Sequence, residues 1–285
     1  MQCDEIGGTM KKIVSCSKAV ATIENGNCLA IGGNVLHRSP MGLVREVARQ
    51  KKQNLKLVKT AGAHDVDVLV RAGCVESVDA GFISYETEYG LATYYRKAAE
   101  NGEIRANEHA CYTVISALNA AKIGVPFMPV RGLMISDLIE VNSYFDKVCD
   151  PFSGQEITVV KAIIPDVAII HVNACDEEGN AIIEGPKFDD VLMSRASKRI
   201  ILSTEKIISK AQIRLNQENV AIPGFLVEAI VVMPRGSAPG DLPGKYDIED
   251  KIIRNFLEEK DDISFDQYLD TYRVQDQGKG GGFSW

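Results

Sequence analysis

A double glycine, Gly32-Gly33, follows the short apolar run 28–31 and precedes a turn that ends at Pro40. Because glycine has no side chain, a ligand can approach the backbone there and peptide N–H groups can point at an anion. In an open α/β sheet, ligands bind at the carboxyl ends of the strands, which is where this pair would lie. A tight strand-to-helix turn also needs glycine for its dihedral angles. The residues alone favour neither interpretation.

Three glutamates lie at the ends of other predicted strands and are candidate catalytic acids. Glu86 and Glu88 belong to the stretch 85–90, which follows one strand, and Glu108 closes the next. A carboxylate held at a strand end can serve in acid–base or nucleophilic chemistry. The same charges occur more often in turns and in the first turn of a helix, where the helix dipole favours them.

Most sequence motifs of catalysis are absent. There is no GxxxxGK[ST], no GxGxxG after the first strand, no HExxH and no GxSxG. The four histidines (His37, His64, His109 and His171) lack the spacing of metal ligands, and an isolated histidine is more often structural than catalytic. The seven cysteines form no CxxC pair. We therefore expect free thiols in a reducing cytoplasm and no metal site.

Apolar runs alternate with amphipathic stretches through the first half of the chain. The predicted order is strand 28–31, helix 41–51, strand 55–59, helix 66–72, strand 77–83, helix 91–100, strand 103–107 and helix 111–122. Four strand-and-helix repeats predict an α/β fold with an open, mainly parallel sheet and helices on both faces.

The second half is less regular. It holds predicted strands at 166–172, 200–203 and 229–233, a proline- and glycine-rich loop at 233–245 and helices at 250–259 and 265–272. The segment 131–165 shows no regular element pattern. We expect a single domain over residues 12–260, between a disordered extension at 1–11 and a weakly ordered tail at 261–285.

Composition narrows the function further. The 285 residues carry 32 basic and 39 acidic side chains, a net charge of −7. This balance argues against a nucleic-acid binder, which needs a basic face, and 45% hydrophobic residues argue against a disordered chain. No apolar run reaches the roughly 18 to 20 residues that span a bilayer. The start lacks the order of a signal peptide because Lys18 interrupts its apolar run, so we expect a cytoplasmic protein without membrane contact.

The segment from Asn25 to Pro40 resembles the signature of the family I coenzyme A transferases. Asn25-Gly26, the aliphatic residues 29–31, the double glycine and Pro40 all match it. Asn34 departs from the pattern, because the family has an aromatic residue there, and Arg38 replaces a glycine. The second change is similar to the loops of the α subunits of glutaconate CoA-transferases.

Four further blocks resemble the same family in the same order. They are LATYYRKAAENGE at 91–103, AAKIGVPFMP at 120–129, DVAIIH at 166–171 with the polar stretch after it, and IPGFLVEA at 222–229. Each block is weak alone, but five in order are specific. The chain is identified as an α-type member of this family, closest in pattern to the α subunits of glutaconate CoA-transferases.

The resemblance implies covalent catalysis by a glutamate. It attacks an acyl-CoA thioester, CoA thiolate then attacks the resulting anhydride, and an acceptor carboxylate reverses the sequence. In two-subunit members this glutamate belongs to the β subunit, in the context S-E-N-G. Glu24-Asn25-Gly26 imitates that string but precedes the strand, and we interpret Glu24 as a turn residue. The resemblance thus implies a hetero-oligomer with a β subunit, CoA as substrate and no permanently bound cofactor. Since members of the family pair α with β, it also implies a large interface that involves the apolar strands and the irregular segment 131–165.

The substrate- or CoA-binding residues that the resemblance indicates are Gly32, Gly33, Asn34 and Arg38. Asn34 could bond an acyl carboxylate or cap the following turn. Arg38 could pair with the distal carboxylate of a dicarboxylic acyl group or with a CoA phosphate, or it could be an ordinary surface arginine.

Two other functions fit the same fold. One is a CoA-thioester or ring-opening carbon–carbon hydrolase that uses a carboxylate of this chain, for which Glu86, Glu88 and Glu108 are the candidates. In relatives of this kind the catalytic glutamate aligns near Cys111, which weakens this interpretation. The other is a ligand-binding or regulatory module of the sugar-phosphate-isomerase-like fold.

Overall fold

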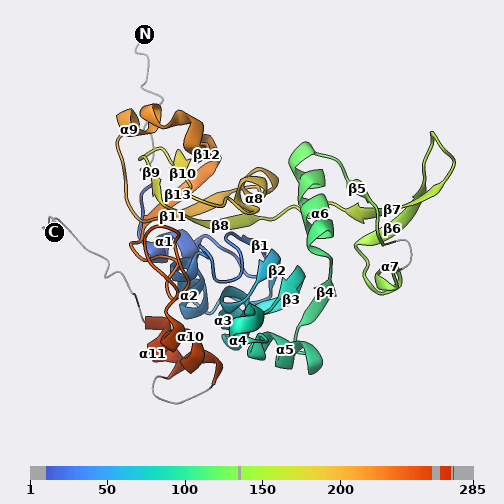
Figure 1. Cartoon of the computed structure of the whole chain (residues 1–285), viewed down its shortest axis with the longest axis horizontal. Coiled ribbons are helices and arrows are strands. Elements are labelled where there is room, and N and C mark those ends of the chain that lie inside the picture. The colour runs from blue at the N-terminus through green and yellow to red at the C-terminus, as the bar shows by residue number, and fades with distance from the viewer. Residues whose placement is uncertain (1–10, 134–135, 259–263, 271, 273–285) are drawn as a thin grey trace, which may run out of the picture.

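The structure, a computed structural model, describes residues 11–133, 136–258, 264–270 and 272. At its centre lies a seven-stranded sheet in the order β13-β11-β8-β1-β2-β3-β4, and every neighbouring pair in it is parallel (Figure 1). The strands are β1 (Cys28–Ile31), β2 (Leu55–Gly62), β3 (Val75–Ile83), β4 (Arg105–Glu108), β8 (Val167–Val172), β11 (Ile200–Thr204) and β13 (Val227–Val232). The predicted open parallel sheet is confirmed.

The first strand of the sheet lies in its middle. From β1 the chain builds outward through β2 and β3 to β4, then crosses over and builds outward again through β8 and β11 to β13. The strand order therefore reverses between β1 and β8. In open α/β sheets this reversal point opens a space at the carboxyl ends of the two strands, where ligands bind.

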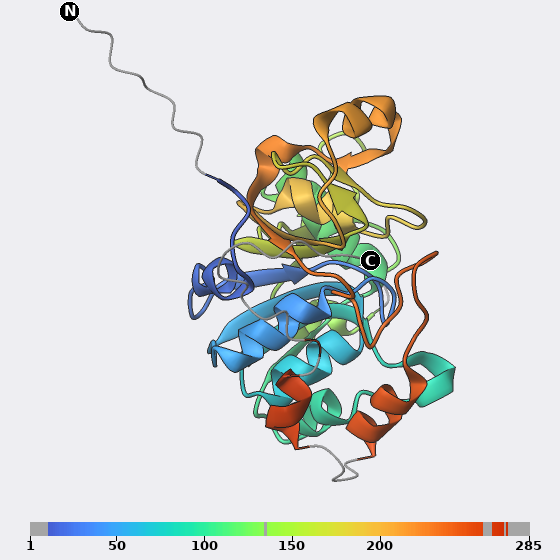
Figure 2. The same ribbon diagram turned by 90° about the vertical axis from the view of Figure 1, so that its left-hand side faces the viewer.

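Helices cover both faces of the sheet, as predicted (Figure 2). One core cluster joins the sheet to α1 (Cys16–Ala21), α2 (Met41–Arg49), α3 (His64–Arg71), α5 (Thr93–Glu100), α10 (Asp250–Leu257) and α11 (Phe265–Asp270). The other joins it to α6 (Cys111–Ile123) and α8 (Asp190–Ala196). Because both faces are covered, β8 is buried at all six positions and its sequence is almost entirely apolar.

Two small antiparallel sheets complete the fold. The strands β5 (Phe127–Val130), β7 (Glu156–Lys161) and β6 (Phe145–Cys149), with the short helix α7 (Leu138–Val141), form an arm over residues 127–161 that projects from the body (Figure 1). The strands β12 (Val220–Ile222), β10 (Ala181–Ile182) and β9 (Ala174–Cys175) pair near α9 (Lys210–Leu215). The sequence indicated an irregular segment at 131–165, because the arm strands are short and half exposed and charges interrupt β6 and bound β7.

Element boundaries follow local capping. Helix α3 begins two residues earlier than predicted, because the Asp65 carboxylate accepts hydrogen bonds from the N–H groups of Ala63 and Val66 at its start. Helix α6 ends where Gly124 adopts a left-handed conformation. Helix α11 lies inside the predicted helix 265–272 and buries Tyr268 and Leu269.

The predicted extension at 1–11 and most of the tail at 261–285 lie outside the described residues, and the domain limits stay a prediction.

Candidate functional site

The loop after β1 turns sharply on the double glycine. Gly33 has a φ of +74°, and a Cβ atom there would lie 2.5 Å from the backbone nitrogen of Ser39. Asn34 and His37 then exchange two backbone hydrogen bonds, of 2.9 and 2.7 Å. Only these two residues of the loop 32–40 are partly exposed; the others are buried. The glycine pair thus brings one tight turn, Asn34 to His37, to the carboxyl edge of the sheet.

The N–H group of Gly33 meets a carboxylate of the protein itself. It donates a 2.7 Å hydrogen bond to Asp190 at the start of α8. The other carboxylate oxygen of Asp190 forms an ion pair with Arg38, and both side chains are fully buried. Arg38 also donates to the carbonyl oxygens of His171, at 3.2 Å, and Pro186, at 2.9 Å. Arg38 is therefore neither a surface residue nor a free cation, and it ties the β1 loop to the end of β8.

A second buried ion pair lies behind the same loop. The Lys59 ammonium group, on β2, contacts Asp65 at 2.5 Å and is fully buried with it. It also donates to the carbonyl oxygen of Gly32, at 2.6 Å, and to the hydroxyl of Ser39, at 3.2 Å. Buried charges are costly unless they are paired and hydrogen-bonded, as these are. Two buried pairs therefore hold the β1 loop from either side.

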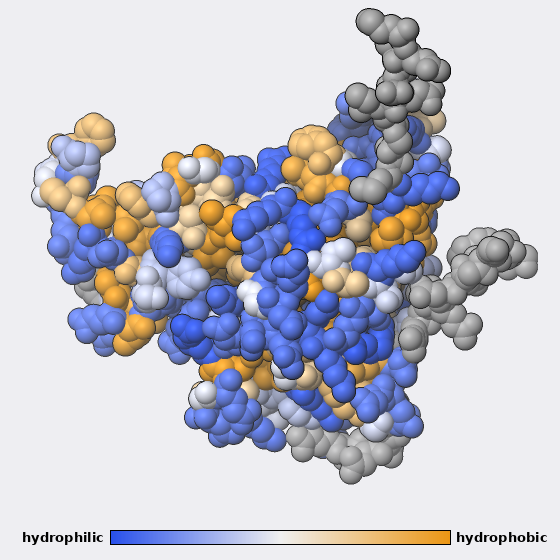
Figure 3. Space-filling model, turned by 180° about the vertical axis from the view of Figure 1, so that it is seen from behind, coloured by the Kyte–Doolittle hydropathy of each residue, from blue (hydrophilic) through white to orange (hydrophobic). Residues whose placement is uncertain are grey.

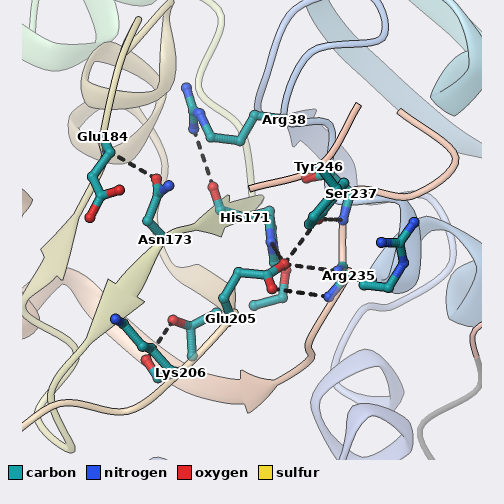
Figure 4. A network of polar contacts seen from close by, with 12 residues as sticks. Arg38, His171, Asn173, Glu184, Glu205, Lys206, Arg235, Ser237 and Tyr246 are labelled. Atoms are coloured by element: carbon teal, nitrogen blue, oxygen red, sulfur yellow. Dashed lines mark hydrogen bonds and ion pairs between the residues drawn. The ribbon is translucent and has the colours of Figure 1, made fainter. Parts of the chain in front are cut away.

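A polar network joins the ends of β8, β11 and β13 (Figure 4). The Glu205 carboxylate accepts hydrogen bonds from the His171 ring at 3.0 Å, the Tyr246 hydroxyl at 2.9 Å and the backbone of Arg235 at 3.1 Å. Burial lowers the pKa of His171, so its ring is neutral near pH 7. It then donates through Nε2, while Nδ1 accepts from Ser203 at 2.9 Å. The network fixes the loop that follows β13.

That loop supplies the partner of His37. The His37 Nδ1 atom lies 2.9 Å from the Asp241 carboxylate, and 37% of the His37 side chain is exposed. Backbone hydrogen bonds of 3.0 Å from Arg38 to Asp241 and from Asp241 to Leu36 hold the two residues together. The hydrogen bond to Asp241, aided by the charges of Asp241 and Glu86, raises the pKa of His37 above its ordinary value. An imidazole with one nitrogen held and the other free can transfer protons.

Four of the eight described residues other than glycine with a positive φ lie at the same edge, whereas Lys51 and Asn54 lie before β2 at the opposite one. Val35, Arg38, Glu86 and Arg235, each shortly after the end of β1, β3 or β13, have φ values between 51° and 62°. Residues other than glycine seldom adopt this region, and for β-branched Val35 it is a clear outlier. Such strain persists only where the surroundings enforce it, and it is frequent in functional sites.

Unpaired polar atoms gather there as well. Among the described residues, the buried atoms without a hydrogen-bond partner include Arg38 Nε, Thr60 Oγ1, Asn173 Nδ2, Ser237 Oγ and Asp241 Oδ1. All five residues belong to the carboxyl ends of strands or to the loops after them. A cavity of about 410 Å³, which Ala174, Glu184 and Lys206 help to line, opens beside the ends of β8 and β11. Its size lies within the usual range for small-molecule sites.

The predicted acids are placed differently from one another. Glu86 is exposed in the short helix α4 (Glu86–Tyr89), and its charge acts on His37. Glu88 forms an exposed ion pair with Arg254 at 2.6 Å. Glu108 is exposed at the end of β4, the outermost strand on its side of the sheet. The fold therefore brings Glu86, and not the other two, toward the loop after β1.

The remaining predicted residues stand as follows. Gly32 and Gly33 shape the turn, and the Asn34 side chain is partly exposed and makes no hydrogen bond with a described residue. Cys111, at the start of α6, places its sulfur 3.5 Å from the carbonyl oxygen of Thr60, and burial raises its thiol pKa. The described residues hold no cluster of three side chains that could bind a metal ion.

Sequence reasoning missed the roles of His37, Asp241, Asp190, Lys59 and Asp65. His37 lies within the loop already singled out, so its position next to the double glycine was a usable signal. Asp190 and Asp241 are more than 150 residues from the loop that they contact, and no local pattern marks them.

Within the part of the chain that the structure describes, no helix is both long and apolar enough to span a membrane.

Three proteins illustrate the relationships of the chain. It is 36% identical to an uncharacterized protein of Archaeoglobus fulgidus, over 86% of its own length and 55% of that protein. It is 30% identical to the A subunit of glutaconate CoA-transferase from Acidaminococcus fermentans, over 86% of this chain and 82% of that one. It is 29% identical to the cholesterol ring-cleaving hydrolase IpdA subunit of Rhodococcus jostii, over 92% and 91%.

Solved structures agree with these relationships. The glutaconate CoA-transferase of Acidaminococcus fermentans superposes with a TM-score of 0.82 at 27% identity, over 87% of this chain and 83% of that one. A cysteine-to-serine variant of the decarboxylase AibA/AibB superposes with a TM-score of 0.82 at 32% identity, over 92% and 98%. The family model described as coenzyme A transferase matches residues 13–233, and the chain therefore belongs to the coenzyme A transferase family.

Proposed function

We propose that the chain is the α subunit of a heteromeric, cytoplasmic CoA-transferase. The enzyme would move CoA between an acyl-CoA and a small carboxylic acid, either glutaconate-like or a 3-oxoacid. One observation carries the proposal: within the described residues, the fully buried carboxylates that contact the β1 loop are already paired. Asp190 binds Arg38 and Asp65 binds Lys59. A nucleophilic carboxylate is then best supplied by another chain.

The proposed chemistry follows from a glutamate of that partner. Its carboxylate oxygen attacks the thioester carbon, CoA thiolate leaves, and an acyl-glutamyl anhydride forms. The thiolate then attacks the glutamyl carbonyl of the anhydride, which releases the first carboxylate and leaves a glutamyl-CoA thioester. The acceptor carboxylate runs both steps in reverse. The present chain contributes a rigid β1 loop whose glycines allow close approach of the backbone.

An exposed apolar surface supports a partner chain. Tyr112, Ile123, Val125, Phe127, Val141, Phe152 and Ile164 are exposed on α6, on the arm and beside it. Apolar residues are visible along the arm, on the left of Figure 3. Contiguous exposed apolar surface commonly marks an interaction site. The names of the glutaconate and hydrolase relatives, which both describe subunits, agree with an enzyme of more than one chain.

A hydrolase is the second candidate, because one observation favours it. Glu86 is exposed, lies in a strained conformation and acts electrostatically on His37. It is thus a carboxylate of this chain close to the candidate site. The hydrolase relative gives this interpretation weight, although the aligned position near Cys111 carries no carboxylate.

The first test is to purify the chain from its own cells under gentle conditions and to identify what accompanies it by mass spectrometry. A partner of similar size with a glutamate in the context S-E-N-G would support the transferase. Incubation of the complex with acyl-CoA should then add CoA covalently to that glutamate, and its replacement by alanine should abolish the adduct. A partner without such a glutamate would favour the hydrolase and direct mutagenesis to Glu86, Glu88 and Glu108. Absence of any partner would overturn the α-subunit proposal.

A further inference from the structure

His37 is held so that one ring nitrogen is occupied and the other is available. Nδ1 faces the Asp241 carboxylate at 2.9 Å, and Nε2 makes no hydrogen bond with a described residue. The ring lies on the turn that Gly33 allows, with 37% of the side chain exposed. Because the Asp241 carboxylate accepts a hydrogen bond from Nδ1–H, the neutral ring keeps its lone pair on Nε2. This is the tautomer that a proton acceptor needs.

The position of the pair is fixed by the backbone. Arg38 N donates to Asp241 O and Asp241 N donates to Leu36 O, both at 3.0 Å, so the aspartate is bonded on both sides of His37. The two residues that flank His37 are buried: Leu36 is 4% exposed and Arg38 is fully buried. Their burial holds the turn in place. A pair held in this way loses little entropy when it reacts.

The charges around the ring favour proton transfer over anion binding. The charged groups that act on His37 are Asp241, from the loop after β13, and Glu86, from α4 after β3. Both are acidic, so they stabilise the imidazolium that forms when Nε2 accepts a proton. The same two carboxylates would repel a carboxylate or phosphate group of a substrate. Arg38, the cation that the sequence offered for such an anion, is buried against Asp190.

We propose that His37 is a general base for water and that Asp241 is its positioning residue, giving the assembled enzyme a thioester-hydrolase activity besides CoA transfer. The inference rests on the proposed function, because it requires an acyl-CoA at the carboxyl edge of the sheet. It also assigns the base to a histidine and not to the carboxylates that the sequence suggested.

The step balances with water as the only co-reactant. Nε2 of His37 takes a proton from water while the water oxygen bonds to the thioester carbon, and the carbonyl electron pair moves to its oxygen. When the carbonyl re-forms, the C–S bond breaks and the imidazolium returns the proton to the CoA thiolate. The products are a free carboxylic acid and CoA thiol. A thioester at the partner glutamate would be hydrolysed by the same sequence.

The test uses the complex of this chain with its partner. CoA thiol release from acyl-CoA without an acceptor measures hydrolysis, and CoA movement to an added carboxylate measures transfer. In His37→Gln the glutamine can still bond Asp241 but cannot take a proton. The ratio of hydrolysis to transfer should fall on the order of 100-fold, the usual scale of general base catalysis. Glu76→Gln, at the opposite edge of the sheet, should leave both rates unchanged.

The pH profile separates a base from a structural residue. Hydrolysis by the wild type should rise with pH through the raised pKa of His37, because only the neutral ring accepts a proton. In Asp241→Asn the carboxylate that raises this pKa is gone, so the rise should move to lower pH and reach a lower plateau. This variant keeps the backbone bonds of residue 241, and it tests the inference even if His37→Gln does not assemble.

Other results of these measurements would overturn either the role of His37 or the proposed function. A wild-type complex that transfers CoA but does not hydrolyse acyl-CoA would overturn this inference and leave the proposed function intact. A complex that does neither would overturn the proposed function. An unchanged ratio in His37→Gln, with a KM raised only for dicarboxylic substrates, would make His37 an anion anchor. Loss of hydrolysis in Glu86→Gln, with none in His37→Gln, would assign the base to the glutamate.

Discussion

The ion pairs beside the β1 loop, at the carboxyl edge of the central sheet, are buried far more deeply than those at its amino edge. At the amino edge, Glu76 pairs with Arg105 and Asp166 pairs with Lys198, and the four side chains are between 31% and 66% exposed. At the carboxyl edge, the Arg38–Asp190 and Lys59–Asp65 pairs are fully buried. Each pair joins a basic and an acidic side chain, and the pairs differ in how far these charges have been removed from water.

The difference in the burial of these ion pairs indicates different roles for the two edges of the sheet. An exposed ion pair adds at most about 1 kcal/mol and keeps the surface hydrated, so the amino edge can be closed by ordinary turns. A buried pair is weak evidence for stability, since apolar residues would often serve as well. Its presence twice beside one loop, with strained backbone and unpaired polar atoms nearby, indicates that the carboxyl edge is shaped for a ligand.

Removal of one acidic partner at each edge should have very different effects on stability. Asp190→Asn leaves the buried Arg38 guanidinium without a counter-charge, and we expect a loss of about 3 to 5 kcal/mol in the free energy of unfolding. Glu76→Gln unpairs exposed Arg105 and should cost less than about 1 kcal/mol. Urea unfolding at pH 7 measures both. Equal losses of unfolding free energy in the two variants would show that burial of the Arg38–Asp190 pair does not increase the cost of removing one partner.

Two glycines offer a matched pair with a smaller effect. Gly33 and Gly73 have φ values of +74° and +70°, but a Cβ atom would meet backbone atoms at Gly33 and nothing within 4 Å at Gly73. Gly73→Ala should therefore cost only the left-handed strain, about 1 to 2 kcal/mol. Gly33→Ala should cost a further 1 to 3 kcal/mol or so for the forced contact. Thermal unfolding would test this. Equal melting temperatures of the two variants would mean that the β1 loop moves to accommodate the added methyl group without loss of stability.

The smallest effect concerns the pH dependence of stability. The folded-state pKa of His37 is raised, so its pairing with Asp241 stabilises the fold fully below the unfolded pKa of about 6.5 and is lost as pH rises through the folded value. Wild type should exceed Asp241→Asn in unfolding free energy by more at pH 5.5 than at pH 8.5. Because the ring is over one-third exposed, we expect a difference below about 1 kcal/mol. A larger advantage at pH 8.5 would contradict the assigned pair.

The structure differs most from the sequence prediction where contacts join distant segments. The β/α repeats of the first half were predictable because each apolar run ends at glycine, proline or a cap, as at Gly124. The arm was not, because its strands are short, half exposed and depend on pairing with each other. The double glycine marked the site, but its real partner, Asp190, lies 157 residues from Gly33. His37 lies inside the loop that the sequence singled out, yet an isolated histidine has no distinguishing spacing until Asp241 is placed beside it.

The long sequence separations at the carboxyl edge have a consequence for the synthesis of the protein. The bonds of Gly33 and Arg38 to Asp190 span 157 and 152 residues, and that of His37 to Asp241 spans 204. Contacts between residues so far apart in the sequence form late in folding. The long intervening segment must lose conformational entropy before the contact can stabilise the fold. A growing chain can assemble β1 to β4 on the ribosome, but the site must await residue 241. The hydrogen bonds that hold the β1 loop are therefore complete only after residue 241 has been synthesised and folded.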